Sequence, residues 1–342
     1  MTARTESAPS APPPNDPPAN PRPRAGLLQS GVARFVLRLV VTVALLVVLF
    51  RQVPLSQVAE LFGRARADLV ILSGLLFAVS LLGSAYQWWL FLKSQRIEIP
   101  FRKALDFYLV GLFFNNFLPA NVGGDVMKVI DVNRSGGSKA GALTATVMDR
   151  AMGLLVLVLA ATAAAWAAGS SAPFPEMRVP LVVLSAGLAM VFMTVLSRRV
   201  LRQVARLVAI VPGTRLRSHA ARLISHLEML QVDRRIFGIT FVVSVVTQAL
   251  RIAVHYLAAE ALGVHVAPLL FVLLVPAIAV AITLPISIGG FGVREGLGVV
   301  LFGRVGVGAP EAFAFELLSH LVAVLVSAWG GIVFALRGRS RR

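Results

Sequence analysis

The chain has 342 residues, of which 57% are hydrophobic and only 14% are charged, and it contains no cysteine. This composition excludes an ordinary soluble globular protein, and the missing cysteine excludes a disulfide framework, a thiolate metal site and a cysteine nucleophile. The net charge of +17 could indicate nucleic acid binding, but the basic residues lie at the ends of apolar stretches. That placement favours a membrane protein, and we expect no nucleic acid partner.

The N-terminal segment, residues 1–31, holds eight prolines between Ala8 and Arg24 among small and polar residues. Such a segment cannot bury a core, so we expect a disordered cytoplasmic tail. No apolar region precedes Phe35, which is atypical of a cleavable signal peptide. The first hydrophobic segment is therefore expected to remain as a helix.

Six apolar stretches after the tail are long enough to cross about 30 Å of hydrocarbon as helices. They are expected near residues 32–50, 69–92, 144–168, 179–197, 236–259 and 312–336. Two more apolar segments, 107–118 and 266–302, are interrupted by Pro and Gly-Gly and are expected to form broken, re-entrant hairpins. The predicted fold class is an all-α polytopic membrane protein with about eight hydrophobic segments.

The basic residues predict the topology. Of the 33 Lys and Arg, 24 fall in the tail through Arg34 and in segments 93–103, 126–140, 198–235 and 337–342, and 5 fall in the segments of the opposite side. This asymmetry places both termini in the cytoplasm. We divide the chain into a first membrane repeat (32–197), a basic amphipathic cytoplasmic linker (198–235), a second membrane repeat (236–336) and a basic cytoplasmic tail (337–342).

The two interrupted segments share one pattern, L-P-x3-G-G-x3-[KR], which begins at Leu118 and again at Leu284, 166 residues later. In the predicted topology the first hairpin follows a helix that ends inside, and the second follows a helix that ends outside. The two halves are therefore predicted to be inverted repeats, a common plan among transporters with discontinuous helices at the membrane midplane.

The breaks themselves suggest a binding site. Non-helical backbone at membrane depth survives only beside protein or a water-filled cavity. Half-helices that begin near Gly124 and Gly290 are predicted to point free N–H groups into such a cavity, where Lys128 and Arg294 add full charges and an anion can be held. The alternative is that Gly-Gly merely permits close helix packing and Pro merely kinks.

Other charged residues lie inside the apolar segments. A charged side chain is unfavourable there and is expected to face a cavity or a partner of opposite charge. Asp149 is interpreted as a helix N-cap near the interface, and His255 as a hydrogen-bonding partner of a neighbouring helix. Arg251 is a candidate ligand for the anion. Arg150 and Glu316, one repeat offset apart, could form a structural salt bridge instead of a ligand site. No metal site and no cofactor are expected.

The stretches "NNFLPANVGGDVMKV" and "LPISIGGFGVREG", with the pair Asp149-Arg150, resemble the lysylphosphatidylglycerol synthase transmembrane-region family, also called the flippase-like domain. The resemblance covers residues 32–336. In that family the membrane domain of the multiple peptide resistance factor moves aminoacylated phosphatidylglycerol between leaflets. Other members occur beside polyprenyl-phosphate sugar chemistry. The resemblance implies a multi-pass protein of the bacterial inner (cytoplasmic) membrane.

The resemblance also implies a set of residues that line or shape the lipid path. These are Asn116, Gly123, Gly124, Asp125, Arg150, Gly289, Gly290, Arg294 and Glu295; the residue pattern adds Lys128 and Arg251. The chain departs from the family near its last helix, where His320 stands in place of an expected arginine. It also lacks an aminoacyl-transferase domain, so we expect no enzymatic synthesis of the lipid.

The sequence therefore predicts a lipid translocase that moves an anionic or aminoacylated phospholipid, or a polyprenyl-phosphate-linked lipid, across the membrane. Two alternatives stay open: a membrane-embedded glycosyl or phosphoryl transferase acting on a polyprenyl carrier, with Asp125 and Glu295 as candidate carboxylates, and a lipid-binding subunit that does not transport. The expected partners are membrane lipids with phosphate headgroups. A separate lipid-modifying enzyme is a further candidate partner.

Overall fold

The protein is seen in a computed structural model that describes residues 31–117, 123–169, 174–197, 233–283 and 289–339, with Ser287 and a few positions between 199 and 206. Within these ranges the regular structure is helical and contains no strand, so the all-α prediction is confirmed. The tail, most of the 198–235 linker, and the two Leu-Pro pairs lie outside the described residues.

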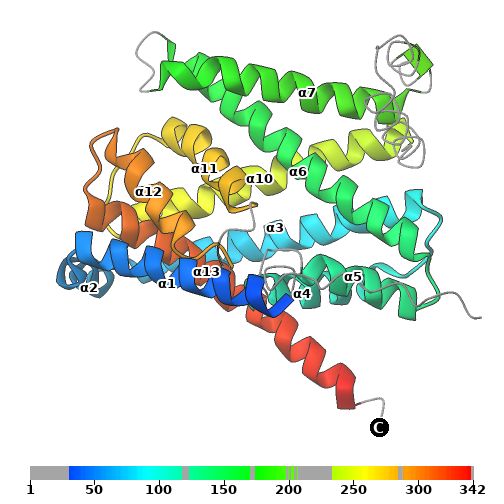
Figure 1. Cartoon of the computed structure of the whole chain (residues 1–342), viewed down its shortest axis with the longest axis horizontal. Helices are drawn as coiled ribbons and strands as arrows, with labels where there is room; N and C mark the ends of the chain where they lie inside the picture. The colour runs from blue at the N-terminus through cyan, green and yellow to red at the C-terminus, as the bar shows by residue number, and fades with distance from the viewer. Residues whose placement is uncertain are drawn as a thin grey trace, which may run out of the picture.

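Most of the described helices follow one another with short connections, and residues 197–233 separate α7 from α10 (Figure 1). Their bounds are α1 Gly31–Gln52, α2 Leu55–Gly63, α3 Ala67–Ser94, α4 Phe101–Phe117, α5 Gly123–Arg134, α6 Lys139–Ala167, α7 Arg178–Leu196, α10 Arg234–Ala261, α11 Pro268–Ile282, α12 Val293–Gly303 and α13 Ala309–Arg339, with a 3-10 turn Pro175–Met177 before α7.

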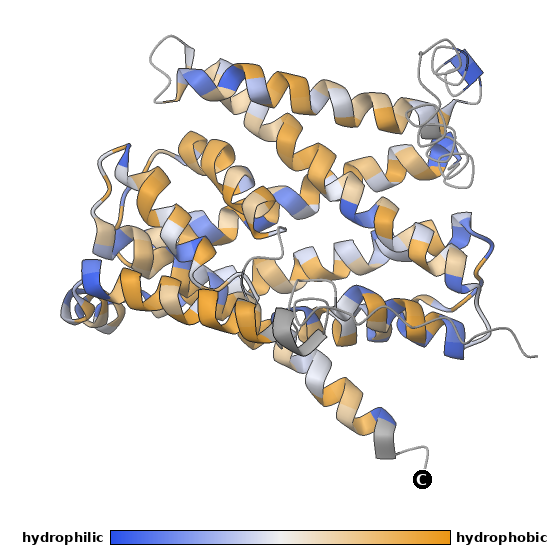
Figure 2. Cartoon of the chain, in the orientation of Figure 1, coloured by the Kyte–Doolittle hydropathy of each residue, from blue (hydrophilic) through white to orange (hydrophobic). Residues whose placement is uncertain are grey.

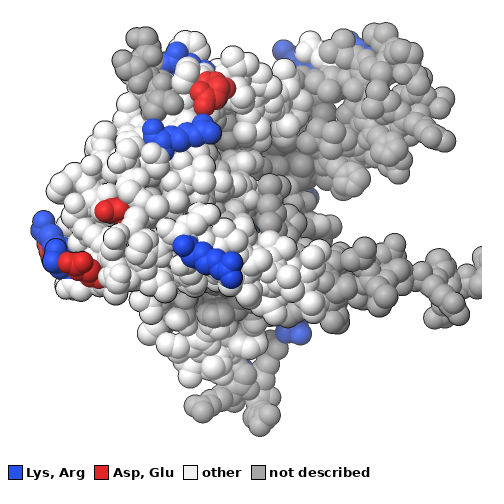
Figure 3. All heavy atoms as spheres, turned by 60° about the vertical axis from the view of Figure 1, so that its left-hand side comes forward, with Lys and Arg blue, Asp and Glu red and all other residues white. Residues whose placement is uncertain are grey.

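Among the described helices, five are long and apolar enough to cross a membrane, and the pair α1–α2, bent by 84°, counts as a sixth. Hydrophobic residues cover most of the length of these helices and hydrophilic residues gather near their ends (Figure 2). On the face in Figure 3, wide uncharged areas separate a few small groups of charged residues. The protein is therefore a multi-pass membrane protein, as predicted.

The two predicted hairpins are present as pairs of shorter helices, α4 with α5 and α11 with α12. The first begins earlier than expected, at Phe101 rather than near residue 107, because its polar first turn continues the same helix. In Figure 1 the α4–α5 pair lies toward the right-hand end of the molecule and the α11–α12 pair toward the left-hand end. Each hairpin therefore occupies a different part of the length of the bundle.

The helix order repeats with the offset found in the sequence. Shifting the bounds of α3, α4, α5 and α6 by 166 residues gives 233–260, 267–283, 289–300 and 305–333. These ranges overlap α10, α11, α12 and α13 respectively. The inverted relation of the two sets, and the domain boundaries, stay predictions.

Two apolar clusters hold the hairpins in place. One packs α11 and α12 against α13, with Phe271, Phe302 and Phe315 in mutual ring contact at centroid distances of 4.9–5.8 Å. The other packs α4 and α5 against α3 and α6 around the fully buried Trp88 and Met152. Because lipid tails are as apolar as these side chains, close packing rather than water exclusion must stabilise both clusters within the membrane.

Candidate functional site

A polar cavity of about 600 Å³ lies where the two hairpins meet helices α3, α6 and α10. Seven of the predicted site residues line it: Asn116, Asp125, Lys128, Arg150, Arg251, Gly289 and Arg294. Four others are not in its wall: Gly123, Gly124, Gly290 and Glu295. The structure thus brings together the predicted charged side chains of both hairpins, except Glu295.

The charges on the first-hairpin side of the cavity are compensated. Lys128 Nζ lies 3.0 Å from Asp125 Oδ1 and 4.0 Å from Asp149 Oδ2, and all three side chains are buried. The guanidinium of Arg150 pairs with the second oxygen of Asp125. Gln87 Nε2 donates to Asp149 Oδ1 at 2.8 Å. Buried charges persist only with such partners, so this cluster stabilises the wall.

Arg251 and Arg294 differ from that cluster. Arg251 donates to Ser84 Oγ at 2.9 Å, but among the described residues neither arginine forms an ion pair with a carboxylate. The Nε atoms of both are buried without a hydrogen-bond partner in the described part of the chain. The described wall carries four cations (Lys128, Arg150, Arg251 and Arg294) and two carboxylates (Asp125 and Asp149), an excess of positive charge that favours an anion.

The second glycine of the first hairpin, Gly124, serves close packing. A Cβ atom at Gly124 would overlap the backbone oxygen of Gly111 in α4. The Gly124 N–H donates to Asn115 Oδ1 at 2.8 Å. The prediction that this N–H is free for an anion is therefore wrong, because a side chain of α4 already satisfies it.

In the second hairpin, glycine is required by backbone conformation. Gly289, Gly290 and Gly292 have φ values of 61°, 84° and 80°, a region that L-residues with side chains rarely adopt. Helix α12 begins at Val293 rather than near Gly290, and Glu295 Oε2 accepts from Gly292 N at 2.7 Å. A Cβ at Gly289 would lie 2.7 Å from the backbone oxygen of Asn116, so the breaks of the two hairpins touch there.

Two histidine–carboxylate pairs lie beside the cavity. Glu295 Oε1 lies 2.9 Å from His320 Nδ1, and Glu316 Oε1 lies 3.1 Å from His255 Nδ1. His255 thus joins α10 to α13, as expected of a residue that bonds a neighbouring helix. The predicted Arg150–Glu316 salt bridge is wrong: the ion pairs of these residues in the described chain are with Asp125 and with His255 instead.

The sequence interpretation missed part of the wall. Asp149 is not an N-cap, because α6 begins ten residues earlier and its cap is Ser138, whose Oγ accepts from Gly141 N. Uncharged polar residues of α3 and α10 were also missed: Ser84, Gln87, Ser244, Thr247 and Gln248. Their spacing of three, four and seven residues along two otherwise apolar spans, with Arg251 on the same face, was the available signal.

The uncharged polar side chains of this wall are suited to hydrogen bonding with a ligand. The described residues include no group of three or more His, Asp and Glu side chains that could hold a metal ion. The hydroxyl and amide groups of the wall can donate hydrogen bonds to phosphate oxygens and accept them from sugar or glycerol hydroxyls. The same wall carries two guanidinium groups that form no ion pair with a described carboxylate, and guanidinium groups can donate charge-assisted hydrogen bonds to an anion.

Comparison with known proteins places the chain in a family. A family model described as "Lysylphosphatidylglycerol synthase TM region" matches residues 35–330. A UPF0104 membrane protein of Pyrococcus horikoshii is 29% identical over 126 residues, which are 36% of this chain and 38% of that protein. The family match covers both hairpins and every helix that lines the cavity. The chain therefore belongs to the lysylphosphatidylglycerol synthase transmembrane-region family.

Proposed function

We propose that this protein is a lipid translocase that carries a lipid with an anionic, phosphate-bearing headgroup across the membrane. The observation that carries the proposal is the pair Arg251 and Arg294, two guanidinium groups in one membrane-embedded cavity without a carboxylate partner among the described residues. A cation kept unpaired at membrane depth is unfavourable for stability, so its presence indicates a ligand that compensates it.

The mechanism follows from the two environments that a phospholipid needs. Its headgroup requires water or protein hydrogen bonds, which the cavity supplies, while its tails can stay in the surrounding hydrocarbon. Arg294 stands on α12 of the second hairpin, and Arg251 stands on α10. A phosphate between them would accept charge-assisted, bidentate hydrogen bonds and lose most of the barrier to crossing the hydrocarbon.

The transferase alternative requires a carboxylate that is available to bind a metal ion or act as a base. Asp125 is held by Lys128 and Arg150, and Glu295 caps α12 while contacting His320. Both candidate carboxylates therefore already have structural partners, which favours the translocase.

The test is redistribution of labelled lipid in liposomes that contain the purified protein. Phosphatidylcholine vesicles carry a trace of fluorescent phosphatidylglycerol or of a polyprenyl phosphate, and a membrane-impermeant quencher reports the fraction in each leaflet. We expect the native protein to equilibrate at least one of these lipids. The Arg251→Gln, Arg294→Gln double variant should be slower by about tenfold or more, since each charge-assisted hydrogen bond contributes about 1.5–3 kcal/mol.

Arg304→Gln is the matched control, because Arg304 is exposed, pairs with Glu176 and does not line the cavity. It should redistribute lipid like the native protein. Native protein that moves neither anionic lipid faster than protein-free vesicles would contradict translocation. Rapid binding without redistribution would favour the lipid-binding subunit, and loss of activity in Asp125→Asn with normal activity in Arg294→Gln would favour the transferase.

A further inference from the structure

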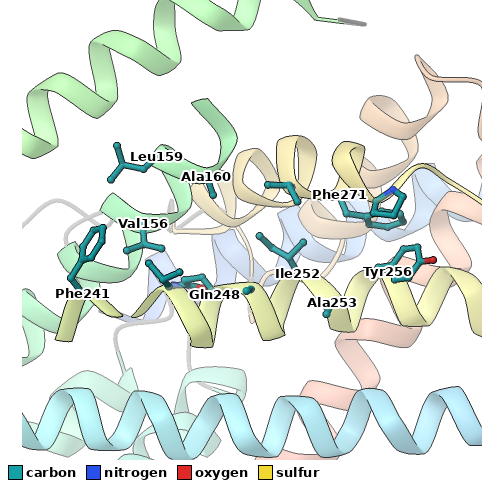
Figure 4. A pocket seen from close by; sticks show the side chains of 13 residues that line it. Val156, Leu159, Ala160, Phe241, Gln248, Ile252, Ala253, Tyr256 and Phe271 are labelled. Carbon is teal, nitrogen blue, oxygen red and sulfur yellow. The ribbon is translucent and has the colours of Figure 1, made fainter. Parts of the chain in front are cut away.

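A second cavity, of about 440 Å³, runs beside the polar one between α6, α10 and α11. Apart from Gln248 and the Tyr256 hydroxyl, its side chains are hydrocarbon, and Figure 4 shows them along the length of α10. Phe241 lies at one end, Phe271 and Tyr256 lie at the other, and Val156 and Leu159 of α6 form the facing wall. We call this cavity the apolar slot.

The slot and the polar cavity are neighbours that share one lining residue. Gln248 lines both cavities, and its Nε2 donates to the backbone oxygen of Gly153 in α6 at 3.3 Å. A Cβ at Gly153 would lie only 2.8 Å from that amide nitrogen. The absent side chain of Gly153 thus lets Gln248 stand at the boundary between a polar chamber and an apolar one.

The slot is longer than one leaflet is deep. Phe241 and Tyr256 are fifteen positions apart on α10, which corresponds to about 22 Å along the helix. Half of the hydrocarbon core is only about 15 Å thick. A groove for a lipid that stays in one leaflet would not need to extend past the membrane midplane. A groove for the hydrocarbon chain of a lipid whose headgroup crosses the membrane would need to do so.

We propose that the apolar slot holds one hydrocarbon chain of the same lipid whose headgroup occupies the polar cavity. This inference rests on the proposed function and narrows its substrate to a lipid with a long chain. The second chain stays in the bilayer. Gln248 marks the junction of headgroup and chain, where its amide can hydrogen-bond an ester or phosphate oxygen while its methylene groups contact the chain.

The experiment is photo-crosslinking of purified protein in phosphatidylcholine vesicles. The probe is phosphatidylglycerol with a diazirine in one acyl chain, and the comparison probe is phosphatidylcholine with the same chain. Crosslinked peptides are identified by mass spectrometry. We expect phosphatidylglycerol to label the slot segments of α6 and α10 about tenfold more than phosphatidylcholine, and the Arg251→Gln, Arg294→Gln double variant to remove this excess.

Filling the slot gives an independent readout. Ala249 lines the slot and is exposed, so Ala249→Phe should occlude it without disturbing the packed core. Val246→Phe is the matched control, because Val246 is 53% exposed on the same helix but outside the slot. Ala160→Phe occludes the slot from α6 and serves if the first variant is misfolded. Occlusion should reduce slot labelling and lipid redistribution, and Val246→Phe should change neither.

Equal labelling of the slot by the two probes would overturn the proposal, because the slot would then hold any bilayer lipid. A phosphatidylglycerol preference that appears only in segments away from α6, α10 and α11 would overturn it as well. In both cases a normal rate of lipid redistribution in the native protein would leave the proposed function standing. A native protein that neither selects nor moves an anionic lipid would instead contradict the proposed function.

Discussion

The two hairpins carry the same sequence pattern, yet the basic residue of the first forms a close ion pair and the basic residue of the second forms none with a described carboxylate. Lys128 of the first hairpin is buried and lies 3.0 Å from Asp125, with Asp149 at 4.0 Å. Arg294, at the equivalent position of the second hairpin, makes no ion pair with a described carboxylate. The first cation is paired within the protein's own structure, and the second is the one that we propose binds a ligand. A repeated motif thus does not imply a repeated role.

The glycine pairs differ in the same way. Gly124 is needed because the backbone of Gly111 approaches it, whereas Gly290 is needed because its φ is 84°. The first hairpin is therefore held by close packing of two helices. The second contains a tight backbone turn that places Gly289 against Asn116 of the first. The polar cavity depends on the packing of the first hairpin and on the turn of the second, since the turn brings the breaks of the two hairpins together.

The largest expected effect concerns the predicted inverted orientation of the two membrane repeats. Each labelling site should react from one side of the membrane and not from the other. The chain has no native cysteine, so Lys139→Cys and Arg304→Cys can each be labelled alone. Lys139 is substituted rather than the neighbouring Ser138, because the Ser138 side chain caps α6 and its loss would disturb the helix. An impermeant maleimide should label the first only from the cytoplasmic side and the second only from the opposite side. Labelling of both from one side would break the inverted-repeat prediction.

The next largest effect is on stability. Lys128→Met should lower the free energy of unfolding by about 3–5 kcal/mol, because it leaves the buried Asp149 without its cation and Asp125 with Arg150 alone. Arg294→Met should leave stability unchanged or raise it, because it removes a cation that forms no ion pair with a described carboxylate and whose Nε is buried without a hydrogen-bond partner there. Thermal unfolding in detergent measures both. Equal losses in the two variants would show that the hairpins do not differ electrostatically.

Substitutions of the hairpin glycines should lower the free energy of unfolding by smaller amounts. Gly124→Ala should cost about 1–3 kcal/mol, because the new methyl group overpacks the contact with Gly111. Gly290→Ala should cost about 1–2 kcal/mol through its left-handed conformation, since its nearest neighbour, Ile282, would stand at an ordinary 3.5 Å. The matched control is Gly74→Ala, a helix position with open space around it. A stable Gly124→Ala variant would contradict the packing account.

The smallest expected effect concerns the start of α5. Asn115→Ala removes the acceptor of the Gly124 N–H and should destabilise the protein by about 1 kcal/mol. Asn115→Asp keeps an acceptor oxygen and should be milder. If the two variants unfold at the same temperature, the N–H of Gly124 has another partner and our assignment of its cap fails.

Much of this arrangement could be predicted from the sequence. Hydrophobic length predicts the spans, and the repeated Pro and Gly-Gly breaks predict the hairpins, because these depend on local composition. The partner of each charge could not be predicted. Lys128 and Arg294 look alike in the pattern, and only the packing of α3 and α6 brings Asp149 and Gln87 to the first hairpin. Asp149 was misread for the same reason, since α6 begins earlier than its apolar stretch.

The central claim is that Arg251 and Arg294 hold an anionic headgroup, and lipid affinity tests it most directly. Purified native protein in non-ionic detergent is titrated with phosphatidylglycerol and with phosphatidylcholine of the same chains, beside Arg294→Gln, Arg294→Lys and Arg304→Gln. We expect native protein and Arg304→Gln to prefer phosphatidylglycerol by about tenfold or more, Arg294→Gln to lose that preference, and Arg294→Lys to keep part of it because an ammonium lacks the bidentate fork. An unchanged preference in Arg294→Gln would contradict the account.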